Sequence, residues 1–233
     1  MNKLVRIKAI LLDLLFPCFC MGCKKEGSFL CQHCRSLLKT IPPTCFVCHK
    51  LSWPSGRTCD SCRPKTAIYA FLSPFSYGDE AIKELIHHLK YNRVRGLAEI
   101  LADLLKDYLQ KYKIWLPKEA LLIPIPLHKT RQRERGFNQT ELIAKVFTSE
   151  TSLILAKDVL IKTKPTKSQI ELSSEERRKN LSGVFTVSKP QEIQGKTIIL
   201  LDDVKTTGTT LEEAATTLKS AGAKRVWAMT VAH

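Results

Sequence analysis

The placement of cysteine constrains this chain more than any other feature of its sequence. All nine cysteines lie between Cys18 and Cys62, and the rest of the chain contains none. Two thiolates at Cys-x-x-Cys spacing can occupy two corners of a zinc tetrahedron, so two such pairs complete a closed structural site. The sequence therefore predicts two structural zinc ions, with the order of pairing, sequential or interleaved, left open. The predicted ligands form four pairs: Cys20/Cys23, Cys31/Cys34, Cys45/Cys48 and Cys59/Cys62.

Three other uses of cysteine pairs compete with this interpretation. A disulfide framework would need an oxidising compartment, and the sequence shows no credible secretion signal. A single redox-active pair would not occur four times. An iron–sulfur cluster is the main alternative to zinc. Cys18, the one cysteine outside the pairs, is expected to be a partly buried free thiol.

The cysteine-rich segment predicts a division into two domains, residues 1–66 and 67–233. The boundary is placed near Pro64, which interrupts regular structure. Metal binding, worth about 10 to 16 kcal/mol in small zinc modules, would replace a core that the first segment has too few large apolar residues to build. We therefore expect the two domains to have separate cores. Residues 4–15 have apolar side chains at helical spacing and predict an amphipathic helix, with a lipoprotein signal as the alternative.

The charge balance predicts an anionic partner. The chain carries 37 Lys and Arg against 22 Asp and Glu, a net charge of +15. The first 66 residues hold 11 of those basic groups and 3 of the acidic ones, so positive charge is densest in the small domain. Nucleic acid, a phosphate-rich ligand and a membrane surface are the candidate partners. We expect the small domain, helped by an arginine-rich loop at residues 131–135, to bind single-stranded DNA with little sequence preference.

After residue 67 the periodicity alternates between strands and helices. Helices between buried strands imply right-handed crossovers and a parallel sheet covered on both faces. The predicted fold class is α/β. The predicted strands span residues 68–75, 121–125, 197–201 and 226–231, and the predicted helices span residues 79–89, 96–112, 139–147 and 211–220.

The sharpest motif follows the apolar strand at residues 197–201. Asp202 and Asp203 come at its carboxyl end, where open α/β sheets bind ligands. The loop that follows offers hydroxyl groups, backbone N–H groups and a glycine, which together suit a phosphate. This is not a P-loop, because the acids precede the loop and Gly-Lys-Ser/Thr is missing. The loop residues are Lys205, Thr206, Thr207, Gly208, Thr209 and Thr210.

The motif resembles the phosphoribosyl-pyrophosphate (PRPP) site of type I phosphoribosyltransferases. That resemblance implies that Asp202 and Asp203 contact the ribose and a Mg²⁺ ion and that the loop takes the 5′-phosphate. The whole chain resembles the ComF family of competence proteins, which implies a double zinc ribbon before a phosphoribosyltransferase-like domain. In this comparison the pyrophosphate side corresponds to Pro126, Leu127, His128, Lys129 and Arg135, and a hood loop corresponds to Gln169, Arg177, Arg178 and Asn180.

Three functions fit these features. The ComF resemblance implies a PRPP-binding protein that handles imported single-stranded DNA during natural transformation. The alternatives are an active phosphoribosyltransferase, which transfers ribose 5-phosphate to an unidentified acceptor, and a PRPP-sensing scaffold without turnover. The expected location is the cytoplasm, with other competence proteins and the inner face of the membrane as further candidate partners.

Overall fold

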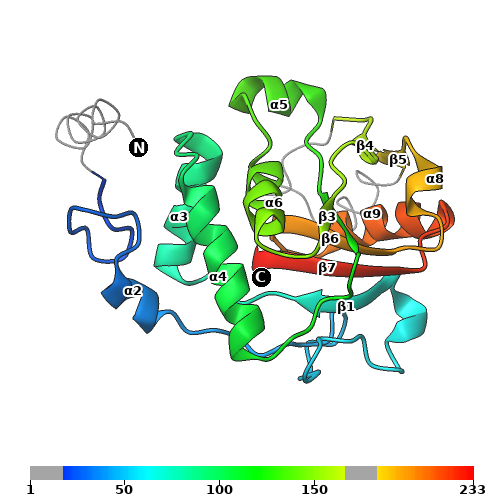
Figure 1. Ribbon diagram of the computed structural model, residues 1–233, viewed down its shortest axis with the longest axis horizontal. Coiled ribbons are helices and arrows are strands. Elements are labelled where there is room, and N and C mark those ends of the chain that lie inside the picture. The colour runs from blue at the N-terminus through cyan, green and yellow to red at the C-terminus, as the bar shows by residue number, and fades with distance from the viewer. Residues whose placement is uncertain (1–17, 166–182) are drawn as a thin grey trace.

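A five-stranded parallel sheet forms the centre of the molecule (Figure 1). The computed structural model describes residues 18–165 and 183–233, so the predicted N-terminal helix and the four predicted hood residues lie outside the described part of the chain. The strand order is β1-β7-β6-β2-β3, and with helices on the sheet this is the α/β fold that the sequence predicts. The strands are β1 (Ile68–Leu72), β2 (Leu121–Pro124), β3 (Ile154–Leu155), β6 (Thr197–Val204) and β7 (Arg225–Ala232).

Strand β6 shows how the sequence builds two buried faces. It pairs with β2 on one side and β7 on the other, which places it in the middle of the sheet. Side chains alternate along a strand. Ile199 and Leu201 therefore join one hydrophobic cluster, while Ile198 and Leu200 join the cluster on the opposite face. A strand buried on both faces needs a near-continuous apolar run, as this segment has.

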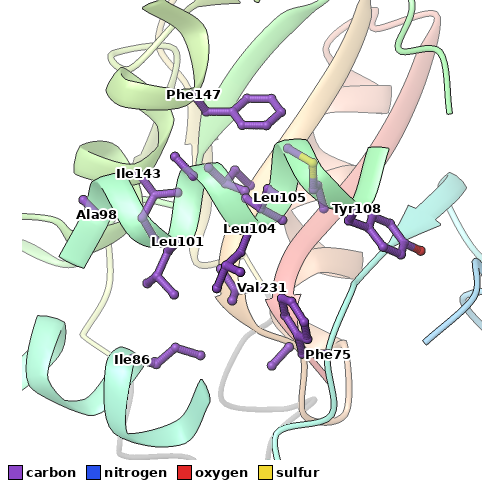
Figure 2. Packing of buried hydrophobic residues seen from close by; sticks show 14 of the residues in the cluster. Phe75, Ile86, Ala98, Leu101, Leu104, Leu105, Tyr108, Ile143, Phe147 and Val231 are labelled. Atoms are coloured by element: carbon purple, nitrogen blue, oxygen red, sulfur yellow. The ribbon is translucent and has the colours of Figure 1, made fainter. Parts of the chain in front are cut away.

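Helices α3 (Glu80–Tyr91), α4 (Leu97–Lys111) and α6 (Gln139–Ser149) cover the first face. Helix α4 directs its apolar stripe, including Leu101 and Leu105, toward Ile143 and Phe147 of α6 (Figure 2). The structure confirms the three helices expected here to within two residues at each end. No helix in the described ranges is both long enough and apolar enough to span a membrane.

Helix α9 (Thr209–Ser220) covers the second face, together with the short helix α8 (Pro190–Ile193) and an antiparallel hairpin of β4 (Leu160–Lys162) and β5 (Phe185–Val187). The sequence analysis missed the hairpin, α8 and β3. Each is only two to four residues long, which is too short to show a hydrophobic period.

The cysteine-rich segment is divided between the two faces of the sheet. It contains helix α2 (Gln32–Leu37) and the 3₁₀ helix η1 (Arg63–Lys65). Cys20, Met21, Leu30 and Cys34 belong to the cluster under α3 and α4, whereas Phe46 belongs to the cluster under α9. The expectation of separate cores is therefore wrong, because these residues complete hydrophobic clusters built by the rest of the chain. The domain boundary near residue 66 stays a proposal.

The topology marks one place on the sheet for a ligand. From β2 the chain moves outward to β3, and from β6 it moves to β7 on the other side. The two connections diverge between the neighbouring carboxyl ends of β2 and β6. In open α/β sheets ligands bind at such a switch point, because the loops there separate and leave a crevice.

Candidate functional site

The eight paired cysteines form two clusters of four sulfurs. Within each cluster the ligand atoms all lie within 4.8 Å of one another. The Sγ atoms of Cys45 and Cys59 are 3.7 Å apart, as are those of Cys48 and Cys59. Zn–S bonds of about 2.3 Å place tetrahedral sulfurs about 3.8 Å apart, so each cluster fits one tetrahedral metal ion. The pairing is sequential: cluster 1 is Cys20, Cys23, Cys31 and Cys34, and cluster 2 is Cys45, Cys48, Cys59 and Cys62.

The first pair of each cluster has the same backbone turn. The carbonyl of Cys20 accepts from the N–H of Lys24 at 2.8 Å, and the carbonyl of Cys45 accepts from the N–H of His49 at 3.0 Å. Lys24 and His49 both adopt a positive φ, 60° and 57°. In cluster 1 the N–H of Cys31 also donates to the Sγ of Cys20 at 3.3 Å. Such donors stabilise a thiolate, which is the form that binds metal.

A cleft of about 470 Å³ opens at the switch point between β2 and β6. We call it the switch-point cleft. The structure brings nine of the predicted site residues to it: Pro126, Leu127, Arg135, Asp202, Asp203, Lys205, Thr206, Gly208 and Thr210. The described lining does not include His128, Lys129, Thr207 or Thr209.

Asp203 lies at the centre of a polar network beneath this cleft. Its Oδ1 is 2.6 Å from the Nζ of Lys90, and its Oδ2 accepts from the Nε2 of Gln139 at 2.7 Å. Gln139 in turn accepts from Nη1 of Arg135 at 2.8 Å. Burial alone would lower the pKa of Lys90, but the Asp203 carboxylate outweighs it and raises that pKa. Asp203 therefore ties α3 and α6 to the end of β6.

Asp202 has a different environment. Its Oδ1 accepts from the N–H of Asp203 at 2.9 Å, and in the described part of the chain no cation forms a salt bridge with it. Burial, followed by the charge of Asp203, raises the pKa of Asp202 to about 7, against the opposing effect of Lys90. Lys162 also lines the cleft, where burial and then Arg131 lower its pKa to about 8. Asp202 is thus the carboxylate that remains available to a ligand.

The loop after Asp203 packs on cysteine cluster 2. Gly208 has φ +80° and precedes α9, and a Cβ atom there would lie 2.8 Å from the Cζ of Phe46. The Nζ of Lys205 is 5.1 Å from the Phe46 ring centre and 5.2 Å from that of Phe71. Burial lowers the pKa of Lys205. Glycine is required at 208 both by its left-handed φ and by the closeness of Phe46.

Helix α5 (Lys129–Arg135) stands where the sequence analysis expected an irregular arginine-rich loop. His128 caps it, because its Nδ1 accepts from the N–H of Thr130 at 3.3 Å, and Gly136 with φ 79° ends it. The expectation was wrong because Lys, Arg, Gln and Glu are good helix formers, so the charge run also favours a helix. The helix directs Arg135 over the ring of Tyr91, 5.0 Å from its centre.

Comparison with known proteins identifies the family. The family model described as "Phosphoribosyl transferase domain" matches residues 134–233. "Competence protein F" from Haemophilus influenzae is 30% identical over 221 residues, which cover 90% of this chain and 89% of that protein. The chain belongs to the competence protein F family. "Competence protein ComFC" from Bacillus subtilis is 32% identical over 214 residues, which cover 85% of this chain and 81% of that protein.

Two further similarities were found. "DNA utilization protein YhgH" from Escherichia coli K12 is 27% identical over 226 residues, which cover 93% of this chain and 98% of that protein. The solved structure of a glutamine PRPP amidotransferase from Bacillus subtilis matches 58% of this chain and 25% of its own, at 18% identity and a TM-score of 0.36. A score this low adds nothing to what the family model and the strand order already show.

Sequence reasoning did not place Lys90, Gln139 or Phe46 in the site. Lys90 is the last polar residue of α3, Gln139 is the first residue of α6, and Phe46 follows a cysteine. One signal was present: Gln139 is polar but falls on the inner side of an amphipathic helix, where a buried amide needs a partner. Its partner, Asp203, is 64 residues away in the sequence, so only the fold could identify the pair.

Proposed function

We propose that this member of the competence protein F family binds PRPP together with Mg²⁺ in the switch-point cleft, and that it does so in the handling of single-stranded DNA. The observation that carries the proposal is an available carboxylate, Asp202, next to a hydroxyl-rich loop that opens α9. The backbone N–H groups and Thr hydroxyls of such a loop can bind a phosphate. Charge also supports an anionic ligand, because the lining contains five cations: Lys90, Arg131, Arg135, Lys162 and Lys205.

Each part of the cleft has a role in this proposal. Asp202 accepts hydrogen bonds from the ribose hydroxyls, and the loop at residues 205–210 binds the 5′-phosphate. Arg135, at the end of α5, faces the pyrophosphate together with Pro126 and Leu127, which also line the cleft. Asp203 acts indirectly, because Lys90 and Gln139 already occupy one oxygen each. It positions Asp202 by fixing the end of β6.

The donor set fits a magnesium ion that arrives with its ligand. Mg²⁺ is usually bound by one or two carboxylates together with oxygen atoms of the substrate. Asp202 offers one such carboxylate at the cleft. When bound, the ion would neutralise charge on the pyrophosphate. The two cysteine clusters are unsuited to Mg²⁺, which prefers oxygen ligands.

Calorimetry with PRPP and Mg²⁺ tests the binding site. Asp202→Asn removes a charge-assisted acceptor worth about 1.5 to 3 kcal/mol, so affinity should fall by roughly 10 to 150-fold. Asp158→Asn is the matched control, since Asp158 is an exposed aspartate outside the cleft. Unchanged PRPP affinity in Asp202→Asn would refute the site.

The role in DNA handling rests on other observations. Relatives bear the names "Competence protein F" and "DNA utilization protein YhgH", and this chain has a net charge of +15. Fluorescence anisotropy with a labelled oligothymidylate should show binding that weakens with salt, with a log-log slope of about −0.7 for each phosphate contact. The absence of binding at low salt would contradict this part of the proposal.

Transfer of the ribose 5-phosphate is a second candidate function, which Lys162 favours. An amine whose pKa is about 8 is partly neutral near physiological pH and can accept a proton. In such a reaction the bond from the ribose C1 to pyrophosphate breaks, a bond from C1 to an acceptor nitrogen forms, and Lys162 takes the acceptor's proton. Pyrophosphate release from PRPP and nucleobases, lost in Lys162→Met, is the expected result. Release that persists in that variant would exclude this role for Lys162.

A further inference from the structure

A second cleft, of about 440 Å³, lies at the opposite edge of the sheet from the switch-point cleft. We call it the amino-edge cleft, because the parallel strands β1 and β7 begin there, at Ile68 and Arg225. It is formed by η1, by the starts of these two strands and by Lys219 near the C-terminal end of α9. The cysteine-rich segment and the sheet therefore both contribute to its walls.

The charges that line this cleft have one sign. Five of its ten lining residues are basic, and the described lining includes no Asp or Glu. In the switch-point cleft, by contrast, two carboxylates offset the cations. A concave surface with one sign of charge concentrates a ligand of the opposite sign. The five cations are Arg57, Arg63, Lys219, Lys224 and Arg225.

Three arginines converge on one aromatic ring in this cleft. The guanidinium carbons of Arg63, Arg225 and Arg57 lie 4.5, 4.6 and 5.8 Å from the centre of the Tyr69 ring. Cation–π attraction of about 0.5 to 1 kcal/mol at exposed sites holds these side chains in place although their charges repel one another. Tyr69 therefore pre-arranges a group of guanidinium planes.

Most of these five cations form no salt bridge with a carboxylate of the described residues. Asp60 forms a salt bridge with Arg57 at 3.5 Å, but both groups are largely exposed and the pair is weak. In residues 18–165 and 183–233 no carboxylate forms a salt bridge with Arg63, Lys224 or Arg225. The nearby Glu212 is engaged by the hydroxyl of Thr66 and by the N–H of Ala67.

We propose that the amino-edge cleft binds the backbone of single-stranded DNA. The phosphates contact Arg63, Lys224 and Arg225, and unstacked bases lie on the guanidinium planes around Tyr69, as bases do in single-strand sites. A single strand is favoured over a duplex because the cleft presents no helix face or ribbon that could enter a major groove. This inference rests on the proposed DNA function and adds the location. The cleft combines Arg57 and Arg63 of the small domain with the amino edge of the sheet, and it does not include residues 131–135, which the sequence also suggested.

The location has a direct consequence for the two ligands. PRPP is proposed at the carboxyl ends of the strands and DNA at their amino ends, so neither occupies the other's site. The protein should therefore bind both at once, and saturating PRPP should not displace DNA. Arg131 and Arg135, by contrast, line the switch-point cleft, and DNA bound there would compete with PRPP.

Anisotropy with a labelled oligothymidylate tests the location by substitution. The triple variant Arg63→Gln, Lys224→Gln, Arg225→Gln should lose affinity at low salt, and its log-log salt slope should become shallower by about 2, or 0.7 for each of three lost contacts. The control variant Lys83→Gln, Lys118→Gln, Lys145→Gln removes the same charge from exposed positions outside both clefts and should bind like wild type. Equal loss in the two triple variants would overturn the inference.

A measurement on the unaltered protein covers the case in which the first triple variant fails to fold. Lys219 and Lys224 are exposed, so reductive methylation followed by mass spectrometry should label both, and oligothymidylate should protect them more than Lys118. Protection of Lys129 instead, or displacement of DNA by PRPP, would overturn the location. Absence of any DNA binding by the wild-type protein would refute the DNA function itself, while PRPP calorimetry on the same sample reports separately on the switch-point cleft.

Discussion

The two cysteine clusters share one sequence pattern but differ in what they support. In each, the residue after the first cysteine points into the protein core: Met21 in cluster 1 and Phe46 in cluster 2. Met21 joins the hydrophobic cluster under α3 and α4, whereas Phe46 contacts Gly208 and Lys205 of the proposed phosphate loop. Cluster 1 therefore supports the helical layer, and cluster 2 supports the loop that is proposed to bind phosphate.

This difference shows that the same arrangement of four cysteines can support different parts of the fold. Both clusters fit one tetrahedral ion, and both have the same turn at their first pair. The two clusters pack on opposite faces of one sheet, so we expect their effects on ligand binding to differ. We expect cluster 2 to be coupled to PRPP affinity and cluster 1 to be coupled to stability alone.

Removing one metal at a time should produce the largest difference. Cys45→Ser with Cys48→Ser should abolish PRPP binding, because Phe46 is then no longer held beneath the loop. Cys20→Ser with Cys23→Ser should lower the melting temperature but leave PRPP affinity unchanged below the melting transition. Elemental analysis should give two zinc ions in the wild type and one in each variant. Equal loss of PRPP affinity in both variants would contradict the expectation that only cluster 2 is coupled to PRPP binding.

Shortening the two core-facing side chains should have a smaller effect, because both metals stay bound. Phe46→Ala should destabilise the fold by about 3 to 5 kcal/mol and Met21→Ala by about 2 to 5 kcal/mol, the usual range for buried side chains of these types. Only Phe46→Ala should weaken PRPP binding, since Met21 belongs to the hydrophobic cluster on the other face of the sheet. Denaturant unfolding measures the first quantity and calorimetry the second. A loss of affinity in Met21→Ala would contradict the assignment.

Adding one methyl group at either of two glycines should separate metal binding from ligand binding. Gly208→Ala meets Phe46 at 2.8 Å and also places a side chain at φ +80°, which costs about 1 to 2 kcal/mol from the backbone alone. It should weaken PRPP binding and retain both metals. Gly22→Ala meets the Sγ of Cys34 at 2.7 Å and should weaken metal binding in cluster 1 while PRPP affinity is kept. The reverse pattern would disprove the coupling.

The effect of pH on stability and on PRPP affinity should be the smallest, and it should arise from Asp202 in the switch-point cleft. The pKa of Asp202 is raised from 3.8 to about 7 by burial, so the folded protein keeps a proton that the unfolded chain releases. This contribution stabilises the fold fully below about pH 3.8 and is lost as pH rises toward 7. Relative to Asp202→Asn, the wild-type melting temperature should therefore fall over that range, while the affinity for PRPP with Mg²⁺ should rise. Parallel pH profiles in the two proteins would contradict this.

Local patterns predicted much of the fold and part of the site. The helices α3, α4, α6 and α9 have apolar stripes long enough to show a period, and β6 and β7 each contain an apolar run of four residues, 198–201 and 226–229. The acidic pair and the loop after it were found because they follow directly on the apolar run at residues 198–201 of β6. Helix α5 was missed because its arginines fit both a solvated loop and a helix, and only the caps at His128 and Gly136 decide between them.

The four cysteine pairs, the α/β class and the loop that follows Asp203 could be predicted from the sequence alone, because each depends on residues close together along the chain. Three features became known only from the tertiary structure: which cysteine pairs combine, how Asp203 is shared between Lys90 and Gln139, and where the cations lie together. It also placed Phe46 against Gly208, a contact between residues far apart in sequence. The spacing of residues along the sequence does not reveal such contacts, because strand order and helix packing bring those side chains together.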